Sequence, residues 1–157
     1  MLSLIFGISG ALKVNKLNKL IAYSSISHIG FILCSIVSFN FEIFLFYFTI
    51  YSFISISIFI IFFNLINPLS GQSLNTINQL SYLKKINYIY FISLTISFFS
   101  ISGIPPLSGF FSKFFIFVGL LNLNMNFLVL ILLLFSVVGC FYYLRLIKTI
   151  SFNNNKN

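Results

Sequence analysis

The chain has 157 residues, of which 59% are hydrophobic and 20% aromatic, while only 6% are Asp, Glu, Lys or Arg. A typical soluble domain carries about 25% charged residues. This composition therefore excludes a soluble globular protein, because too few polar side chains are present to cover a water-facing surface. We expect an all-α membrane protein whose apolar side chains face hydrocarbon. The net charge of +8 does not indicate nucleic-acid binding, because the basic residues are scattered among apolar runs.

Residue types that carry redox, metal or hydrolytic chemistry are scarce. Cys34 and Cys140 lie far apart, with no CxxC pair and no histidine cluster, so neither a metal site nor an iron–sulfur ligand set is predicted. No paired carboxylate, Ser/His/Asp set or nucleotide loop is present, so we expect no catalytic centre and no cofactor in this chain. The amino terminus has no targeting signal, and residues with A/T-rich codons dominate. Both features favour an organelle-encoded protein.

The sequence predicts a polytopic transmembrane helix bundle with four crossings in a single membrane domain. A spanning helix needs about 20 apolar residues. Residues 1–12 are too short to span and are predicted to be a partial helix, and the turn-rich stretch after residue 66 is predicted to be a loop. The four predicted crossings are residues 20–39, 43–66, 86–121 and 127–147.

One of these crossings is predicted to be discontinuous. Residues 86–121 would make about 54 Å of helix, which is too long for one straight crossing and too short for two. The middle of this range reads SGIPPLSG, at residues 102–109, and consecutive prolines flanked by glycines interrupt the hydrogen-bond ladder of a helix. The residues predicted to form the helix break are Gly103, Pro105, Pro106 and Gly109.

The distribution of charge supports four crossings. This topology places eight of the nine basic residues on one side of the membrane, which we expect to be the matrix side and to hold both chain ends. These residues are Lys13, Lys16, Lys19, Lys84, Lys85, Arg145, Lys148 and Lys156.

Lys113 is the remaining basic residue, and it follows the helix break within the apolar run FFSKFFIF. A charged lysine at that depth costs about 2.5 to 3.5 kcal/mol on insertion scales. One interpretation is a protonation site beside a water-accessible break. The other is a lysine that caps the free carbonyls of the broken helix, with its head reaching toward an interface. We favour the first, because ionisable residues inside membranes are usually functional.

Other polar residues give weaker signals. His28 suits a proton relay, but a lone histidine on a helix is equally consistent with packing. Lys16, Lys19, Tyr23 and Ser27 follow one face of the first crossing and either line a hydrated path or mark interhelical contacts, with Lys19 best placed to reach inward. Two further patterns are expected to have structural roles: packing for Tyr47, Tyr51 and Ser55, and an interfacial belt for Tyr142, Tyr143 and Arg145.

Three segments carry a resemblance to a known family. They are LNKLIAYSSISHIGF at residues 17–31, SGIPPLSGFFSKFFIF at 102–117 and GCFYYLRLIK at 139–148. Together they resemble the carboxy-terminal part of the subunit 2 family of proton-pumping NADH:ubiquinone oxidoreductase, respiratory complex I, over nearly the whole chain. The first segment is shared by all antiporter-like subunits and by cation/proton antiporters, whereas the other two indicate subunit 2.

The resemblance implies a proton-translocating, non-redox subunit in the mitochondrial inner membrane. It implies proton-transfer roles for Lys113, Lys19 and His28, with FMN, iron–sulfur clusters and NADH bound by other subunits. Nothing in the chain matches the family's preceding helical half, so we expect a separate chain to supply that half of a split subunit. Further expected partners are the other complex I membrane subunits and lipids. The alternatives are a structural subunit that does not conduct protons and a cation/proton antiporter subunit.

Overall fold

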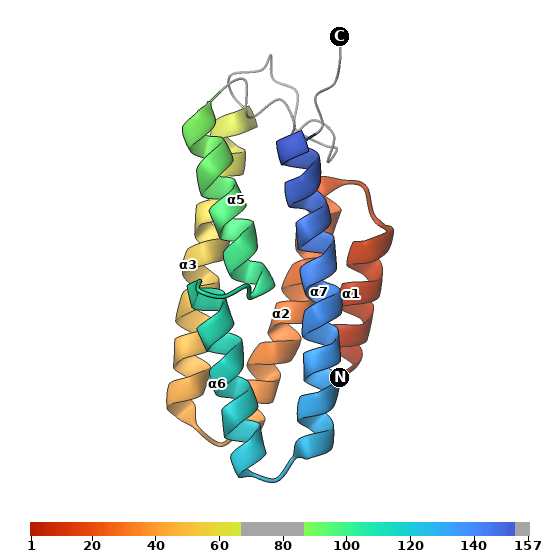
Figure 1. Cartoon of the computed structure of the whole chain (residues 1–157), viewed down its shortest axis with the longest axis vertical. Helices are drawn as coiled ribbons and strands as arrows, with labels where there is room; N and C mark the ends of the chain where they lie inside the picture. Colours follow the sequence, from red (N-terminus) through yellow and green to blue (C-terminus); the bar gives the residue numbers. More distant parts are fainter. Residues whose placement is uncertain (67–86, 153–157) are drawn as a thin grey trace.

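A computed structural model describes residues 1–66 and 87–152 of the chain, and these residues form six α-helices and no strand. The expected all-α bundle is thereby confirmed. The predicted loop after residue 66 and the basic residues Lys84, Lys85 and Lys156 lie outside the described residues. The helices, labelled as in Figure 1, are α1 (Leu2–Lys13), α2 (Leu17–Val37), α3 (Phe41–Ile66), α5 (Tyr88–Ser102), α6 (Ser108–Asn122) and α7 (Asn126–Phe152).

Three of these helices are long and apolar enough to cross a membrane. They are α2 over Leu17–Val37, α3 over Phe41–Asn64 and α7 over Asn126–Ser151. Helices α5 and α6 have 15 residues each, which is about 23 Å of helix and less than the roughly 30 Å of a hydrocarbon core. Neither of these two helices could span a bilayer alone.

The chain between α5 and α6 leaves helical geometry at Gly103, Pro105 and Pro106 of the predicted break, whereas Gly109 lies inside α6. Gly103 has φ +84°, in the left-handed region that favours glycine. Pro105 and Pro106 have no N–H group and cannot continue a helical ladder. Figure 1 shows the result, with α5 in the upper half of the bundle, α6 in the lower half and a short linker between them.

Helix α1 packs closely against α2 because glycines face the contact. A Cβ atom added at Gly7 would lie 2.7 Å from the backbone nitrogen of Ser27, and one at Gly10 would overlap the ring of Tyr23. Small residues of this kind let two helix backbones approach each other. The face of α2 that carries Tyr23 and Ser27 is therefore turned toward α1.

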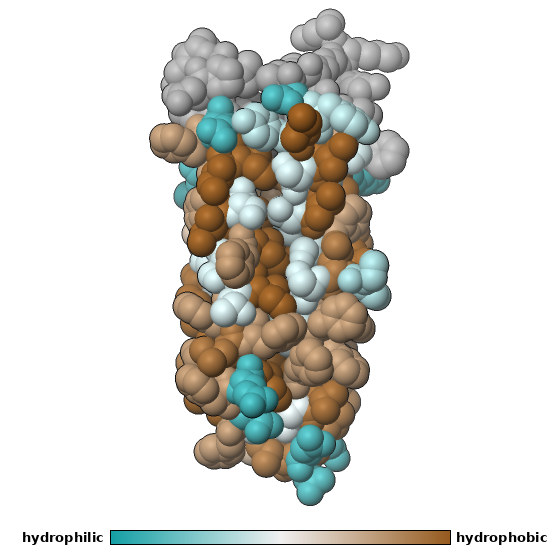
Figure 2. All heavy atoms as spheres, turned by 90° about the vertical axis from the view of Figure 1, so that its left-hand side faces the viewer, coloured by the Kyte–Doolittle hydropathy of each residue, from teal (hydrophilic) through white to brown (hydrophobic). Residues whose placement is uncertain are grey.

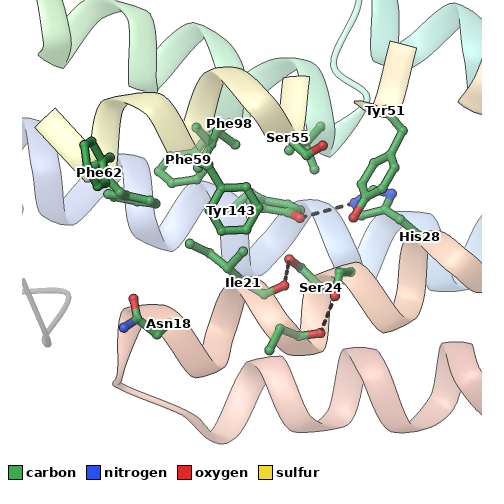
Figure 3. Close-up of a pocket in the computed structure, with 15 residues that line it drawn as sticks. Asn18, Ile21, Ser24, His28, Tyr51, Ser55, Phe59, Phe62, Phe98 and Tyr143 are labelled. Carbon is green, nitrogen blue, oxygen red and sulfur yellow. Dashed lines mark hydrogen bonds between the residues drawn. The ribbon is translucent and has the colours of Figure 1, made fainter. Parts of the chain in front are cut away.

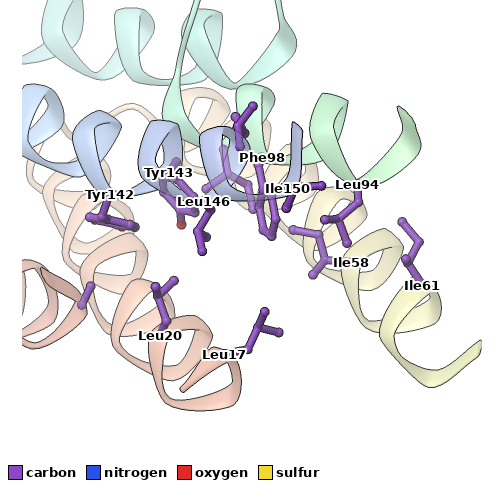
Figure 4. Close-up of a cluster of buried hydrophobic side chains, with 13 residues drawn as sticks. Leu17, Leu20, Ile58, Ile61, Leu94, Phe98, Tyr142, Tyr143, Leu146 and Ile150 are labelled. Carbon is purple, nitrogen blue, oxygen red and sulfur yellow. The ribbon is translucent and has the colours of Figure 1, made fainter. Parts of the chain in front are cut away.

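The buried apolar side chains form two clusters. The upper cluster joins α2, α3, α5 and α7 around Leu94 and Phe98 (Figure 4). The lower cluster joins the other half of the bundle around Leu4, Ile116 and Leu132. His28 and Lys113 are among the buried polar residues, and His28 links the two clusters through Tyr143 of the upper one and Tyr47 of the lower one.

Large apolar side chains also cover the outside of the bundle. Phe53, Phe59 and Phe63 of α3 are 73%, 59% and 69% exposed. On the face displayed in Figure 2, hydrophilic residues gather toward the two ends of the molecule, and mostly hydrophobic or neutral residues lie between them. Such an exterior fits hydrocarbon better than water.

Apart from the buried Lys113, the charged residues that the structure describes lie at the two ends of the bundle. The charged end, at the top of Figure 1, holds the C-terminal end of α1, the N-terminal end of α2 and the last turns of α7. There the guanidinium of Arg145 donates a hydrogen bond of 3.4 Å to the side-chain oxygen of Asn15. Glu42 lies at the start of α3 and therefore at the opposite end. The basic residues of the charged end are Lys13, Lys16, Lys19, Arg145 and Lys148.

Candidate functional site

Lys113 lies in the second turn of α6 and is buried, with only 7% of its surface exposed. Its ammonium donates hydrogen bonds of 3.2 Å to the carbonyl oxygen of Ile101 and 3.0 Å to that of Ser102. These residues end α5, where the last carbonyls of a helix lack helical partners and carry partial negative charge. Lys113 therefore caps the broken helix, as one of the two sequence interpretations expects, but its head remains buried and does not reach an interface.

Two neighbours hold the lysine head in place. The ammonium nitrogen lies 5.4 Å from the centre of the Phe31 ring, within the range of a cation–π interaction. A Cβ atom at Gly103 would lie 3.1 Å from Cδ and 3.2 Å from Nζ of Lys113. Gly103 thus provides both the left-handed backbone and the space through which the lysine reaches α5.

The break itself is closed by contacts within the chain. The hydroxyls of Ser100 and Ser108 lie 3.2 Å apart, and the Gly109 N–H donates a bond of 3.4 Å to the Ser100 hydroxyl. A Cβ atom at Gly109 would overlap the carbonyl oxygen of Ser100, so the backbones of α5 and α6 touch here. The two half-helices are fastened together at the point where the ladder is interrupted.

His28 is the second buried basic residue, with 4% of its surface exposed. Its Nδ1 lies 2.9 Å from the Tyr47 hydroxyl and its Nε2 lies 3.2 Å from the Tyr143 hydroxyl. The imidazole also stacks on Tyr51, with ring centres 5.0 Å apart. A neutral imidazole has one donor and one acceptor nitrogen, so one of the two bonded tyrosines accepts from His28 while the other donates to it.

A cavity of about 550 Å³ connects the charged end of the bundle with His28 (Figure 3). We call it the large cavity. Its polar lining begins at Asn18 and continues through serines of α2 and α3 to the imidazole, while phenylalanines of α3 and α5 form much of its wall. The lining residues that carry polar side chains are Asn18, Ser24, Ser25, His28, Tyr51, Ser55 and Tyr143.

A much smaller void, of about 10 Å³, also borders the imidazole. Its lining includes His28, Tyr47 and Lys113. His28, Tyr51 and Ile101 line both spaces. The imidazole therefore borders both the large cavity and the void that Lys113 lines.

The structure brings together some of the residues that the sequence singles out, but not all of them. Lys113, His28 and Gly109 line the small void. Lys16 and Lys19 are exposed at the charged end. Neither of them lines the large cavity, although their neighbour Asn18 does. The proton-transfer and path-lining roles of Lys16, Lys19, Tyr23 and Ser27 stay predictions.

Sequence reasoning missed the tyrosine partners of His28. The expected interfacial belt is wrong for Tyr142 and Tyr143, because each is only 3% exposed and lies in the upper cluster. Tyr47 and Tyr51 were expected to pack helices together, and they also surround the imidazole. Tyr47 and Tyr51 are four residues apart, which places both rings on one face of α3. This spacing is the sequence signal from which a buried polar partner for the two hydroxyls could have been predicted.

The described residues contain no group of three or more His, Cys, Asp or Glu side chains that could hold a metal ion. Cys34 and Cys140 are both free thiols. What the arrangement offers chemically is two buried basic groups beside each other, with hydroxyl and carbonyl partners. Such groups can bind, hold and pass protons.

Comparison with known proteins adds an independent line of argument. The profile of the NADH:quinone oxidoreductase/Mrp antiporter transmembrane family matches residues 1–139. The chain is 39% identical over 159 residues to NADH-quinone oxidoreductase subunit N of Pelagibacter ubique, covering 98% of the chain and 33% of that relative. It is 39% identical over 162 residues to NADH-ubiquinone oxidoreductase chain 2 of Rhizopus oryzae, covering 98% and 31%.

A solved structure shares the fold. A chain of respiratory complex I from Thermus thermophilus with bound aureothin matches with a TM-score of 0.76 and 23% identity, over 99% of this chain and 35% of that chain. Together with the sequence relatives, this match confirms the resemblance carried by the three segments. The chain spans about a third of the length of the curated relatives it matches.

Proposed function

The chain belongs to the NADH:quinone oxidoreductase/Mrp antiporter transmembrane family, and from this membership we propose that it forms part of the proton-translocating membrane arm of complex I in the mitochondrial inner membrane. It binds no redox group, and FMN, iron–sulfur clusters and NADH belong to other subunits. Its own task is to move protons through Lys113 and His28 while quinone is reduced elsewhere.

The observation that carries this proposal is the position of Lys113. A lysine buried among apolar helices is costly to keep charged, and the chain places a second protonatable group, His28, on the same 10 Å³ void. The sequence contains a single acidic residue, Glu42, and it is exposed at the far end of the bundle. An ion pair within this chain therefore does not explain the lysine, and proton transfer between adjacent basic groups is the role that we propose for it.

We propose four crossings, formed by α2, α3, the pair α5 and α6, and α7. Helices α5 and α6 together contribute about 45 Å of helix, which suits one interrupted crossing. Interrupted helices at membrane depth are tolerated where protein or water covers the free backbone groups, and the Lys113 cap supplies such cover. The charged end faces the matrix, in keeping with the positive-inside rule.

Protons reach the site from the charged end. The large cavity opens at Asn18, next to Lys19 in the sequence, and leads to His28. Serine hydroxyls and the asparagine amide along this wall can bind water. We propose that Lys19 delivers protons to this mouth, that His28 receives them and that Lys113 is their next carrier.

The rest of the path lies outside this sequence, since the relatives are about three times as long. We propose that a separate chain supplies the missing half of the subunit and that other complex I membrane subunits flank both. Identification of the chains that co-purify with this one tests the split. Isolation of a single polypeptide of the relatives' full length that contains this sequence would refute it.

Replacement of Lys113 tests the function itself. Lys113→Arg keeps a cation that can cap α5 but cannot release a proton at physiological pH, and Lys113→Met removes both properties. We expect both variants to lower the number of protons moved per NADH oxidised, measured with the purified complex in liposomes. The exposed Lys148→Met is the matched control and should leave that ratio unchanged. Normal stoichiometry in Lys113→Arg would contradict the proposal.

A second candidate function is supported by the capping geometry. If Lys113 serves only to hold α5 and α6 together, Lys113→Arg should translocate protons normally while Lys113→Met should fail to assemble. An antiporter subunit, the third candidate, would exchange cations for protons in liposomes without NADH. The same set of preparations separates all three functions.

A further inference from the structure

We propose that Tyr143, His28 and Tyr47 form a hydrogen-bonded proton relay between the large cavity and Lys113, which makes the two tyrosines proton-transfer residues alongside the histidine. This inference rests on the proposed function and adds to it the groups that hand the proton on. The three residues come from α7, α2 and α3, and they are called the tyrosine–histidine relay below.

The order of the relay follows from the two spaces that its members line. Tyr143 lines the large cavity and Tyr47 lines the small void, while His28 lines both. The imidazole is bonded to Tyr143 through Nε2 and to Tyr47 through Nδ1. A proton that enters from the large cavity therefore meets Tyr143 first, then the imidazole, then Tyr47 and finally the void beside Lys113.

The relay takes up one proton and releases one, so its net charge does not change. In the starting state, the Tyr143 hydroxyl donates to Nε2 and the Nδ1–H donates to the Tyr47 oxygen. Tyr143 gives its proton to Nε2 as it takes one from water in the cavity, Nδ1 gives its proton to Tyr47, and Tyr47 releases its own hydroxyl proton toward the neutral amine of Lys113. The imidazole ends as the other tautomer, and a flip of the ring that exchanges the places of its two nitrogens, together with rotation of the hydroxyls, resets the relay.

The small size of the void hinders any path by which protons could bypass the relay along a chain of waters. Its volume of about 10 Å³ is close to the least that holds one water, roughly 10 to 15 Å³. One water can be bonded there by Tyr47 and Lys113, but a file of waters has no room. Stacking of Tyr51 on the imidazole, at 5.0 Å, further closes the space beside His28.

Conservative tyrosine variants separate relay from packing. Tyr→Phe removes only the hydroxyl, and Tyr90 of α5 offers a control because it packs against the upper cluster and is not one of the two tyrosines bonded to His28. We expect Tyr47→Phe to slow proton translocation in liposomes about 100-fold, at the lower end of what a positioned proton-transfer group contributes. Tyr143→Phe should lose less, since the large cavity has room for a water to replace the hydroxyl. Tyr90→Phe should translocate at the unaltered rate.

The tautomer of the imidazole gives a second, direct readout. His28 is the only histidine in the chain, so ¹⁵N-histidine incorporated into this chain alone and assembled into the complex reports on one ring. We expect the unaltered complex to populate both tautomers in exchange, and Tyr47→Phe to shift that population. If Tyr47→Phe does not assemble, the unaltered complex decides, because a single fixed tautomer without exchange would overturn the relay.

Failure of the relay can be told from failure of the proposed function. If Lys113→Arg blocks translocation while Tyr47→Phe and Tyr143→Phe conduct at the unaltered rate, protons reach the lysine by another route and the relay is wrong. If Lys113→Arg also conducts normally, the proposed function is wrong. Loss in Lys113→Arg and Tyr47→Phe, with none in Tyr90→Phe, supports both.

Discussion

The two buried basic residues of the bundle differ in the partners that meet them. Lys113 is bonded to backbone carbonyls of Ile101 and Ser102, whereas His28 is bonded to the hydroxyls of Tyr47 and Tyr143. A carbonyl can only accept a hydrogen bond, but a hydroxyl can also donate one. The lysine site can therefore hold a proton, while the histidine site can also pass one along.

The same contrast predicts how each region tolerates change. The lysine site is built by the backbones of α5 and α6, which meet where Gly109 touches Ser100. The histidine site is built by side chains from α2, α3 and α7 that meet through two hydrogen bonds. We expect steric changes at the helix break to cost far more stability than polar changes around the imidazole.

The largest effect is expected from Gly109→Ala. Its Cβ would overlap the Ser100 carbonyl oxygen, which forces α5 and α6 apart at a cost of about 3 kcal/mol. The variant should show a lower unfolding temperature for the purified complex, or fail to assemble. Lys113 should also lose its bonds to α5, so any assembled variant should be defective in proton translocation.

Gly139→Ala is the control for this change. Its Cβ would meet only Tyr142, at an ordinary 3.9 Å, and alanine in a helix interior is favoured over glycine by up to about 1 kcal/mol. This variant should be as stable as the unaltered protein or slightly more so. Equal behaviour of the two alanine variants would show that the backbones do not touch at the break.

A smaller effect is expected from His28→Phe. The variant loses two interhelical hydrogen bonds, which average about 0.6 kcal/mol each in membrane proteins, but it keeps a ring to stack on Tyr51. A loss of stability near 1 kcal/mol should be measurable by thermal unfolding of the complex. Ser35→Ala is the control, because its fully buried hydroxyl bonds only to Ile32 of the same helix and should cost less. If His28→Phe lost as much stability as Gly109→Ala, the lysine site and the histidine site would not differ in their tolerance to change.

The helix break and its lysine are predictable from the sequence because their signals are local. Two prolines between glycines interrupt a helix wherever they occur, and a lysine inside an apolar run is visible without knowledge of the fold. The bonds from Lys113 to Ile101 and Ser102 span only 12 and 11 residues. Capping could therefore be anticipated as one of two interpretations.

The histidine site is not predictable in the same way. Its two bonds join residues that are 19 and 115 positions apart, and the pattern of one helix does not say which face of another it meets. Tyr143 lies two residues from Arg145, a position that resembles a membrane interface in sequence. Only the packing of α7 in the bundle, against α5, α1 and α6, shows that this ring turns inward.

The cap on α5 has an electrostatic consequence for Lys113. Ionisable residues inside a membrane pair with one another or with backbone carbonyls, and a carboxylate partner could itself take up a proton and become neutral. The counter-charge here is the end of a helix dipole, which does not titrate. Within this chain, the electrostatic attraction between the end of α5 and the protonated lysine is thus set by the fold and stays constant. Only the protonation state of Lys113 changes.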